Sequence, residues 1–152
     1  RPPWLDRLMA SGRSQRQLRL APTSFKGVRM LAQALRRGES IGLLPDHAPR
    51  IGEGVWAEFF GRAAFTMTLP RRLQEASGAA LIMTFGERLP QGKGFRLHFE
   101  RLMDEDFDET KLNRAIENLV RGFPAQYFWN FNRYKKMSRR RQGTYRSRAA
   151  TS

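Results

Sequence analysis

The 152-residue chain contains no cysteine and only two histidines. Without cysteine it forms no disulfide, carries no thiolate nucleophile and builds no cysteine-based zinc site. The two histidines, His47 and His98, lie far apart in the sequence, and neither has another histidine or a cysteine near it, so we expect no metal site. The sequence therefore predicts no metal site, and we expect no cofactor.

Long apolar runs are also missing. The longest, Ala79–Met83, is far shorter than the roughly 20 residues of a membrane-spanning helix. Hydrophobic residues nevertheless make up 40% of the chain, and its length is typical of one folded domain.

Acidic residues are scarce, because 14 Asp and Glu face 28 Lys and Arg and leave a net charge of +14. Residues 136–152 contain six of the basic residues and no acid, so residues 1–135 retain +8. We expect a folded part over residues 1–135 and a basic, disordered tail over 136–152. The excess charge indicates an anionic partner, and such a tail would bind RNA, DNA or anionic lipid equally well.

Helical and strand patterns alternate along the chain. Residue 95 begins a strand in which Phe95, Leu97 and Phe99 alternate with polar residues, including His98, which we expect to be solvated. The alternation predicts an α/β fold with a central, mostly parallel sheet flanked by helices. Helices are predicted at 3–10, 23–37, 65–76 and from the acidic run 104–109 to about 120, and strands at 18–21, 40–44, 55–60, 79–85 and 95–102.

The segment at 124–135, PAQYFWNFNRYK, places five aromatic residues within eight positions. On a helix, Tyr127, Phe131 and Tyr134 would share one face and pack on a core. The polar edges of Trp129 and the tyrosines also suit a boundary between water and lipid. Since basic residues follow at once, the segment by itself leaves nucleic acid, a membrane surface and a phosphorylated substrate open as partners.

Asp46 and His47 directly follow the predicted strand 40–44. Ligands of open α/β sheets bind at the carboxyl ends of strands. The alternative is an ordinary turn in which Asp46 bonds nearby backbone.

The motifs in this order resemble those of the late acyltransferases of lipid A biosynthesis, the lauroyl and myristoyl transferases of the glycerophosphate-acyltransferase-like superfamily. Ala125 replaces the glutamate of that family's closing signature, approximately P-E-Q-Y-x-W-x-H-x-R-x-K. The residues that match this signature are Pro124, Gln126, Tyr127, Trp129, Arg133 and Lys135. Further similarity, over almost all of residues 1–135, lies in Arg1-Pro2 (Y-R-P), Pro45-Asp46-His47 (P-D-H), Phe59-Phe60-Gly61, Ala64–Thr66 (A-x-T) and Arg88 with Gly92 and Gly94.

The resemblance implies transfer of an acyl chain from acyl carrier protein to a hydroxyl of a phosphorylated glucosamine disaccharide. In that family a histidine oriented by an acid, in the pattern H-x-x-x-x-D/E, removes the hydroxyl proton. Here Gly52 follows His47 at that spacing and Met103 follows His98, so neither histidine fits. We therefore expect the dyad upstream of Arg1, and expect this chain to be the C-terminal part of the enzyme, inactive by itself.

The resemblance also implies substrate and membrane contacts. The expected partners are acyl carrier protein, a lipid A precursor or related membrane lipid, and the anionic surface of the bacterial inner membrane on its cytoplasmic face, with no nucleic acid. The rival reading is a nucleic-acid-binding module that uses the aromatic segment and the Arg-rich tail. Substrate-binding candidates are Arg1, Asp46, His47, Arg88, Arg29 and Arg50, and membrane-interface candidates are Trp129, Tyr134, Arg133 and Lys135.

Overall fold

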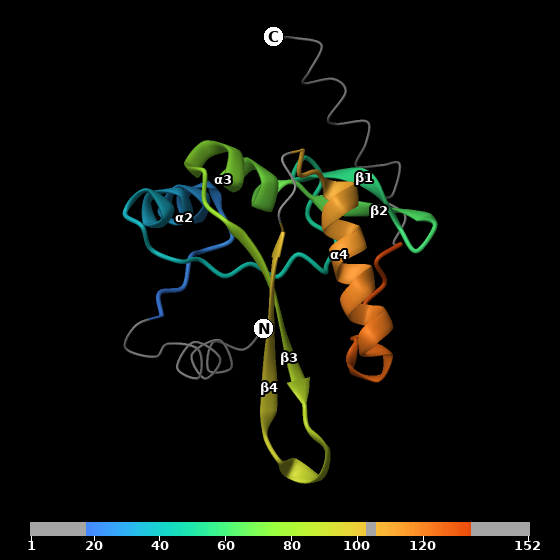
Figure 1. Cartoon of the computed structure of the whole chain (residues 1–152). Coiled ribbons are helices and arrows are strands. Elements are labelled where there is room, and N and C mark those ends of the chain that lie inside the picture. Colours follow the sequence, from blue (N-terminus) through green and yellow to red (C-terminus); the bar gives the residue numbers. More distant parts are fainter. Residues whose placement is uncertain (1–17, 103–105, 135–152) are drawn as a thin grey trace, which may run out of the picture. The chain divides into compact units, whose positions relative to one another are not determined.

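A computed structural model describes residues 18–102 and 106–134, in two compact units that divide after Gly42 (Figure 1). The described part of the first unit contains helix α2 (Phe25–Arg36). This helix confirms the prediction for residues 23–37, because it begins after Ser24 and is followed by Gly38 at a φ of 76°. The predicted helix at residues 3–10 lies outside the described residues.

The second unit holds the remaining elements. They are β1 (Gly54–Phe59), β2 (Arg62–Met67), α3 (Leu69–Ser77), β3 (Leu81–Arg88), a short 3-10 turn (Pro90–Gly92), β4 (Phe95–Leu102), α4 (Glu109–Gly122) and a second 3-10 turn (Pro124–Gln126).

Strands β1 and β2 form an antiparallel pair joined by a two-residue turn, and α4 packs against both of them (Figure 1). The turn residues Phe60 and Gly61 both have positive φ, which matches the twist of hairpin strands. Asp108 begins α4, since its carboxylate accepts the Lys111 backbone N–H at 2.7 Å. The core between these elements consists of Phe59, Ala64, Phe107, Leu112, Ile116 and Val120.

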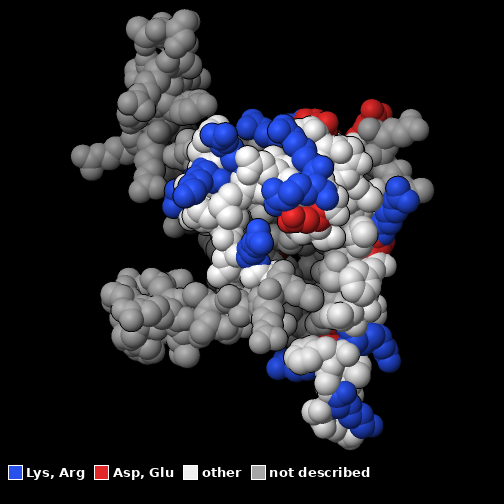
Figure 2. All heavy atoms as spheres, turned by 90° about the vertical axis from the view of Figure 1, so that its left-hand side faces the viewer, with Lys and Arg blue, Asp and Glu red and all other residues white. Residues whose placement is uncertain are grey.

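Strands β3 and β4 form a second antiparallel pair, and β4 has the bounds predicted for residues 95–102. Its apolar face is exposed, however, with Phe95 at 70% and Phe99 at 67%. The opposite face packs instead, because the Phe85 and Phe123 rings stack at 4.7 Å and His98 lies 5.0 Å from Phe123. His98 is thus half-buried rather than solvated. The pair forms the projection at the bottom of Figure 2, where Lys and Arg stand among uncharged residues.

Several expectations need correction. The described residues combine helices with two separate antiparallel pairs and do not show a central parallel sheet. Residues 18–21 and 40–44 form no strand, since no neighbouring strand pairs with them there. The helix expected from residue 65 begins at Leu69, because Phe65 and its neighbours complete the ladder with β1 and Pro70 suits a first helical turn.

Candidate functional site

The closing segment, Pro124–Tyr134, is not the helix that its aromatic spacing predicts. After the turn at Pro124–Gln126, short backbone bonds run from Trp129 N–H to Tyr127 O and from Phe131 N–H to Phe128 O. The Asn132 side chain then accepts the Tyr134 backbone N–H at 3.0 Å. Asparagine side chains that bond local backbone compete with helical bonds, so the segment follows successive turns.

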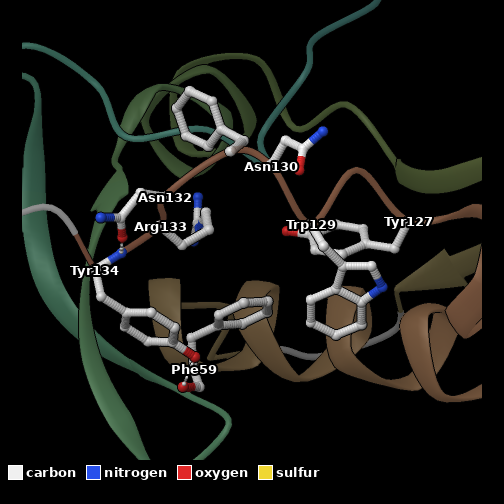
Figure 3. Close-up of a pocket in the computed structure, with 8 residues that line it drawn as sticks. Phe59, Tyr127, Trp129, Asn130, Asn132, Arg133 and Tyr134 are labelled. Atoms are coloured by element: carbon white, nitrogen blue, oxygen red, sulfur yellow. Dashed lines mark hydrogen bonds between the residues drawn. The ribbon is translucent and has the colours of Figure 1, made fainter.

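These turns surround a shallow hollow of about 190 Å³ (Figure 3). Tyr134 bounds it on one side, where its hydroxyl donates to the Phe59 carbonyl at 2.9 Å and Arg62 lies over its ring. Trp129 bounds it on the other side and donates its ring N–H to Pro124 O at 2.8 Å. The hollow is lined by Phe59, Tyr127, Trp129, Asn130, Phe131, Asn132, Arg133 and Tyr134.

Arg133 is buried, with 2% of its surface exposed, although we expected it to face a membrane. One terminal nitrogen, Nη2, donates to Asn113 Oδ1 at 2.9 Å and to Thr66 Oγ1 at 3.5 Å. The guanidinium carbon lies 5.0 Å from the centre of the Phe59 ring. The side-chain nitrogen Nε is buried without a hydrogen-bond partner. Burial lowers the pKa of Arg133, and the nearby Tyr127 and Asp46 oppose that shift.

Asn113 of α4 organises the polar group beneath the segment. Its amide nitrogen donates to Glu58 O at 2.9 Å and to Thr66 Oγ1 at 2.8 Å, and its oxygen accepts from Arg133. Sequence reasoning missed Asn113 and its role with Thr66, since a single asparagine in an amphipathic helix resembles a solvated residue. The signal available was its spacing from Ile116 and Val120, three and seven residues later, which places it on the buried side of α4.

The same guanidinium reaches the loop of the predicted Pro45-Asp46-His47 motif. Its other terminal nitrogen, Nη1, donates to Pro45 O at 3.2 Å. The rings of Phe131 and His47 also pack edge to face, with their centres 6.2 Å apart. Two motifs about 80 residues apart in the sequence therefore lie together, which places Asp46 and His47 beside the closing segment.

The other substrate-binding candidates are Arg50, Arg88, Arg29 and Arg1. Arg50 is exposed after the same loop. Arg88 ends β3, where its backbone N–H donates to Gln126 Oε1 at 2.7 Å and its carbonyl accepts from Gln126 Nε2 at 3.1 Å. Arg29 is exposed on α2 in the first unit, and Arg1 lies outside the described residues. The structure thus gives Gln126 a role that the motif match alone does not suggest, which is to join the closing segment to β3.

Of the membrane-interface candidates, Trp129 is 57% exposed and Tyr134 is half-buried. Lys135 lies outside the described residues. No helix in residues 18–102 and 106–134 has the length and apolar character to span a bilayer.

Within the described part of the chain, no three acidic or histidine side chains gather as a metal site would require. His98 is paired there with a carboxylate, Glu87, at 2.9 Å, but this pair bridges the two strands of the β3–β4 hairpin. The arrangement around Arg133 joins the Pro45-Asp46-His47 loop to β2 and α4. Among the residues that the structure describes, it offers no paired base for proton removal.

Comparison with known proteins supplies the context for this site. The family model for bacterial lipid A biosynthesis acyltransferases matches residues 1–136. The curated lipid A biosynthesis lauroyltransferase of Escherichia coli (strain K12) is 29% identical over 117 residues, which cover 72% of this chain and 38% of that relative. The chain therefore spans about two-fifths of the length of this relative.

Proposed function

Because the chain belongs to the family of bacterial lipid A biosynthesis acyltransferases, we propose that it forms the acceptor-recognition part of such an enzyme. The enzyme transfers a fatty acyl chain from acyl carrier protein to a hydroxyl of a lipid A precursor. It acts at the cytoplasmic face of the bacterial inner membrane.

The observation that carries this proposal is the meeting of two motifs. The Pro45-Asp46-His47 loop and the closing segment both match the family's pattern, and Arg133 hydrogen-bonds from one to the other at 3.2 Å. Residues that recognise one substrate must converge in space. This convergence favours a shared binding site over two unrelated surface features.

The candidate residues fall into two groups in the proposal. The Asp46 carboxylate accepts hydrogen bonds from sugar hydroxyls of the acceptor, and His47 lies beside it. Arg1, Arg29, Arg50 and Arg88 provide positive charge for phosphate or for the acidic carrier protein.

The catalytic base belongs to an H-x-x-x-x-D/E pattern upstream of Arg1, so this chain alone transfers no acyl group. In the whole enzyme the antiparallel pairs of this chain extend a central sheet whose other strands are mostly parallel.

The exposed Trp129 supports contact with the membrane interface. Its ring N–H is already bonded to Pro124 O, so the exposed part of the ring presents a mainly apolar surface. A net charge of +8 over residues 1–135 favours an anionic lipid surface.

Binding of a phosphorylated glucosamine disaccharide to the purified chain tests the recognition role. We expect Asp46→Asn to weaken binding at least tenfold by calorimetry, because it removes a charged acceptor of hydrogen bonds (about 1.5–3 kcal/mol). Asp106→Asn is the matched control, since Asp106 is an exposed acid outside the site. Equal affinities for the two variants, or preferential binding of single-stranded RNA, would contradict the proposal.

The reading frame that surrounds this chain tests the catalytic part. We expect it to encode the histidine–acid pattern upstream of Arg1, and we expect the encoded protein to acylate the precursor from lauroyl acyl carrier protein. A full reading frame without that pattern contradicts the acyl-transfer proposal and leaves the binding result unaffected.

A further inference from the structure

Arg133 connects the core to a loop that contains two of the proposed acceptor-binding residues. We propose that Arg133 is a positioning residue that holds the Pro45-Asp46-His47 loop in its ligand-binding arrangement, with Phe131 as a second support. This inference rests on the proposed function for the identity of the ligand, but the positioning itself is a property of the chain and is measurable without any ligand.

Core residues hold the Arg133 guanidinium in place on the side that faces away from the loop. Nη2 is bonded to Asn113 of α4 and to Thr66 of β2, and the guanidinium carbon lies 5.0 Å from the centre of the Phe59 ring. Since a guanidinium is planar and its donors point in fixed directions, fixing Nη2 also fixes where Nη1 points. The direction of Nη1, and with it the position of the Pro45 carbonyl, therefore depends on α4 and β2.

The loop has little regular structure of its own, because residues 43–50 contain no helix or strand. Beyond the motif, Pro49 packs closely on β1, where a Cβ atom on Gly54 would lie 2.6 Å from Pro49 Cγ and from Thr66 O. Arg133 and Phe131 thus hold the middle of the loop, and Gly54 lets its end approach the strand. Figure 3 shows Arg133 projecting from the closing segment between Tyr134 and Trp129.

The positive charge of Arg133 also affects which ligands the loop would bind. None of the ion pairs among the described residues includes Arg133, and its Nε is buried without a hydrogen-bond partner. A buried cation that lacks a carboxylate partner favours negative charge nearby. It therefore favours an anionic group on a ligand of the loop.

The composition of the chain makes the loop directly observable. The sequence has two histidines, His47 in the loop and His98 on β4. Each imidazole gives its own carbon–proton signals in a nuclear magnetic resonance spectrum, so His47 reports on the loop and His98 serves as an internal reference.

The test compares four variants with the unchanged chain. Arg133→Met removes the fork and the charge, Arg133→Lys keeps the charge without the fork, and Phe131→Leu removes the ring beside His47. Arg121→Met is the control, because Arg121 is an exposed arginine of α4 that bonds Glu117 and does not reach the loop. We expect the His47 signals to shift or broaden in the first three variants, and His98 to stay unchanged in all four.

The second measurement is titration with glucosamine 1-phosphate as the probe. We expect at least a tenfold rise in the dissociation constant for Arg133→Met and Arg133→Lys, a smaller rise for Phe131→Leu, and a change within twofold for Arg121→Met. Failure of Arg133→Lys to restore binding separates positioning from a simple charge effect.

The outcomes distinguish the two proposals. Unchanged His47 signals in folded Arg133→Lys overturn the positioning role. If both Arg133 variants fail to fold, an unchanged probe affinity of Phe131→Leu overturns it, because loss of the Phe131 ring moves the His47 signals by itself. A moved His47 with unchanged probe affinity also overturns it, because the arrangement would then not matter for binding. A further outcome is that the unchanged chain does not bind the probe, although the substitutions change the His47 signals. The acceptor-recognition role then fails, and Arg133 positions the loop for a purely structural purpose.

Discussion

One strand pair of the second unit buries polar residues, whereas the other exposes apolar ones. The pair β1–β2, with α4 and the closing segment, encloses Thr66, Asn113 and Arg133 almost completely. The pair β3–β4 leaves Phe95, Leu97 and Phe99 mostly exposed. Polarity alone therefore does not decide burial here. What decides it is whether a neighbouring element supplies hydrogen-bond partners or an apolar surface.

The largest expected difference between the two pairs concerns one aromatic residue in each. Phe59→Ala should lower the free energy of unfolding by about 3–5 kcal/mol, because Phe59 is fully buried between β2 and α4. Phe99→Ala should change it by no more than about 0.5 kcal/mol, since a mostly exposed ring leaves no cavity. Urea denaturation of both variants measures this, and equal losses would mean that the hairpin face is covered in solution.

The polar group under the closing segment should behave as part of the core. Asn113→Ala leaves Thr66 and the charged Arg133 without their partners, so we expect a loss of about 1–3 kcal/mol in the free energy of unfolding. Asn130→Ala is the control, because Asn130 is an exposed asparagine of the closing segment, and its effect should be nearly neutral. A neutral result for Asn113→Ala would show that water replaces the lost bonds.

On the β3–β4 pair, a polar substitution should improve behaviour in solution. Leu97→Thr keeps a residue that favours strands and reduces the exposed apolar patch, so its effect on stability should stay within about 0.5 kcal/mol. We expect less self-association in light scattering than for the unchanged chain. More self-association, or a marked loss of stability, would argue that the patch is packed within the chain.

The smallest expected effect is a pH dependence confined to alkaline solution. Burial raises the pKa of Tyr127 above its ordinary value, so the folded chain holds the phenol proton more tightly than the unfolded chain does. The stability that this proton provides is complete below about pH 10 and is lost as the pH rises further. Tyr127→Phe should therefore lose less stability than the unchanged chain above about pH 10, which urea titrations at two pH values measure; parallel curves would contradict the assignment.

Local patterns in the sequence predicted α2, β4 and most of α4, because period and capping residues are properties of neighbouring positions. The motif match also singled out Asp46 and His47, whose binding roles stay predictions, and Arg133, which it placed at a membrane surface although the residue is buried. The same local reasoning failed for the closing segment, where aromatic spacing suggested a helix. Hydrogen bonds of the Asn132 and Trp129 side chains with nearby backbone, together with those that Arg133 donates to Asn113 and Thr66, decide that structure.

The exposure of the β3–β4 pair was equally beyond the sequence. Alternation correctly predicted a strand with Phe95, Leu97 and Phe99 on one face, and it implied that this face is the buried one. Contact with Phe123 places the other face inward instead, and that contact is between residues too distant in sequence for any periodicity to report.

The Phe60–Gly61 turn has a consequence for how related sequences vary in length. It fixes Phe59 opposite Arg62 and, through the ladder, Trp56 opposite Phe65. One inserted residue in the turn would slip the register and point Thr66 away from Asn113, so the hydroxyl that accepts from both Asn113 and Arg133 would be lost. We therefore expect relatives to keep this turn at two residues, while the Pro90–Gly94 turn, which lies far from that polar group, tolerates insertions.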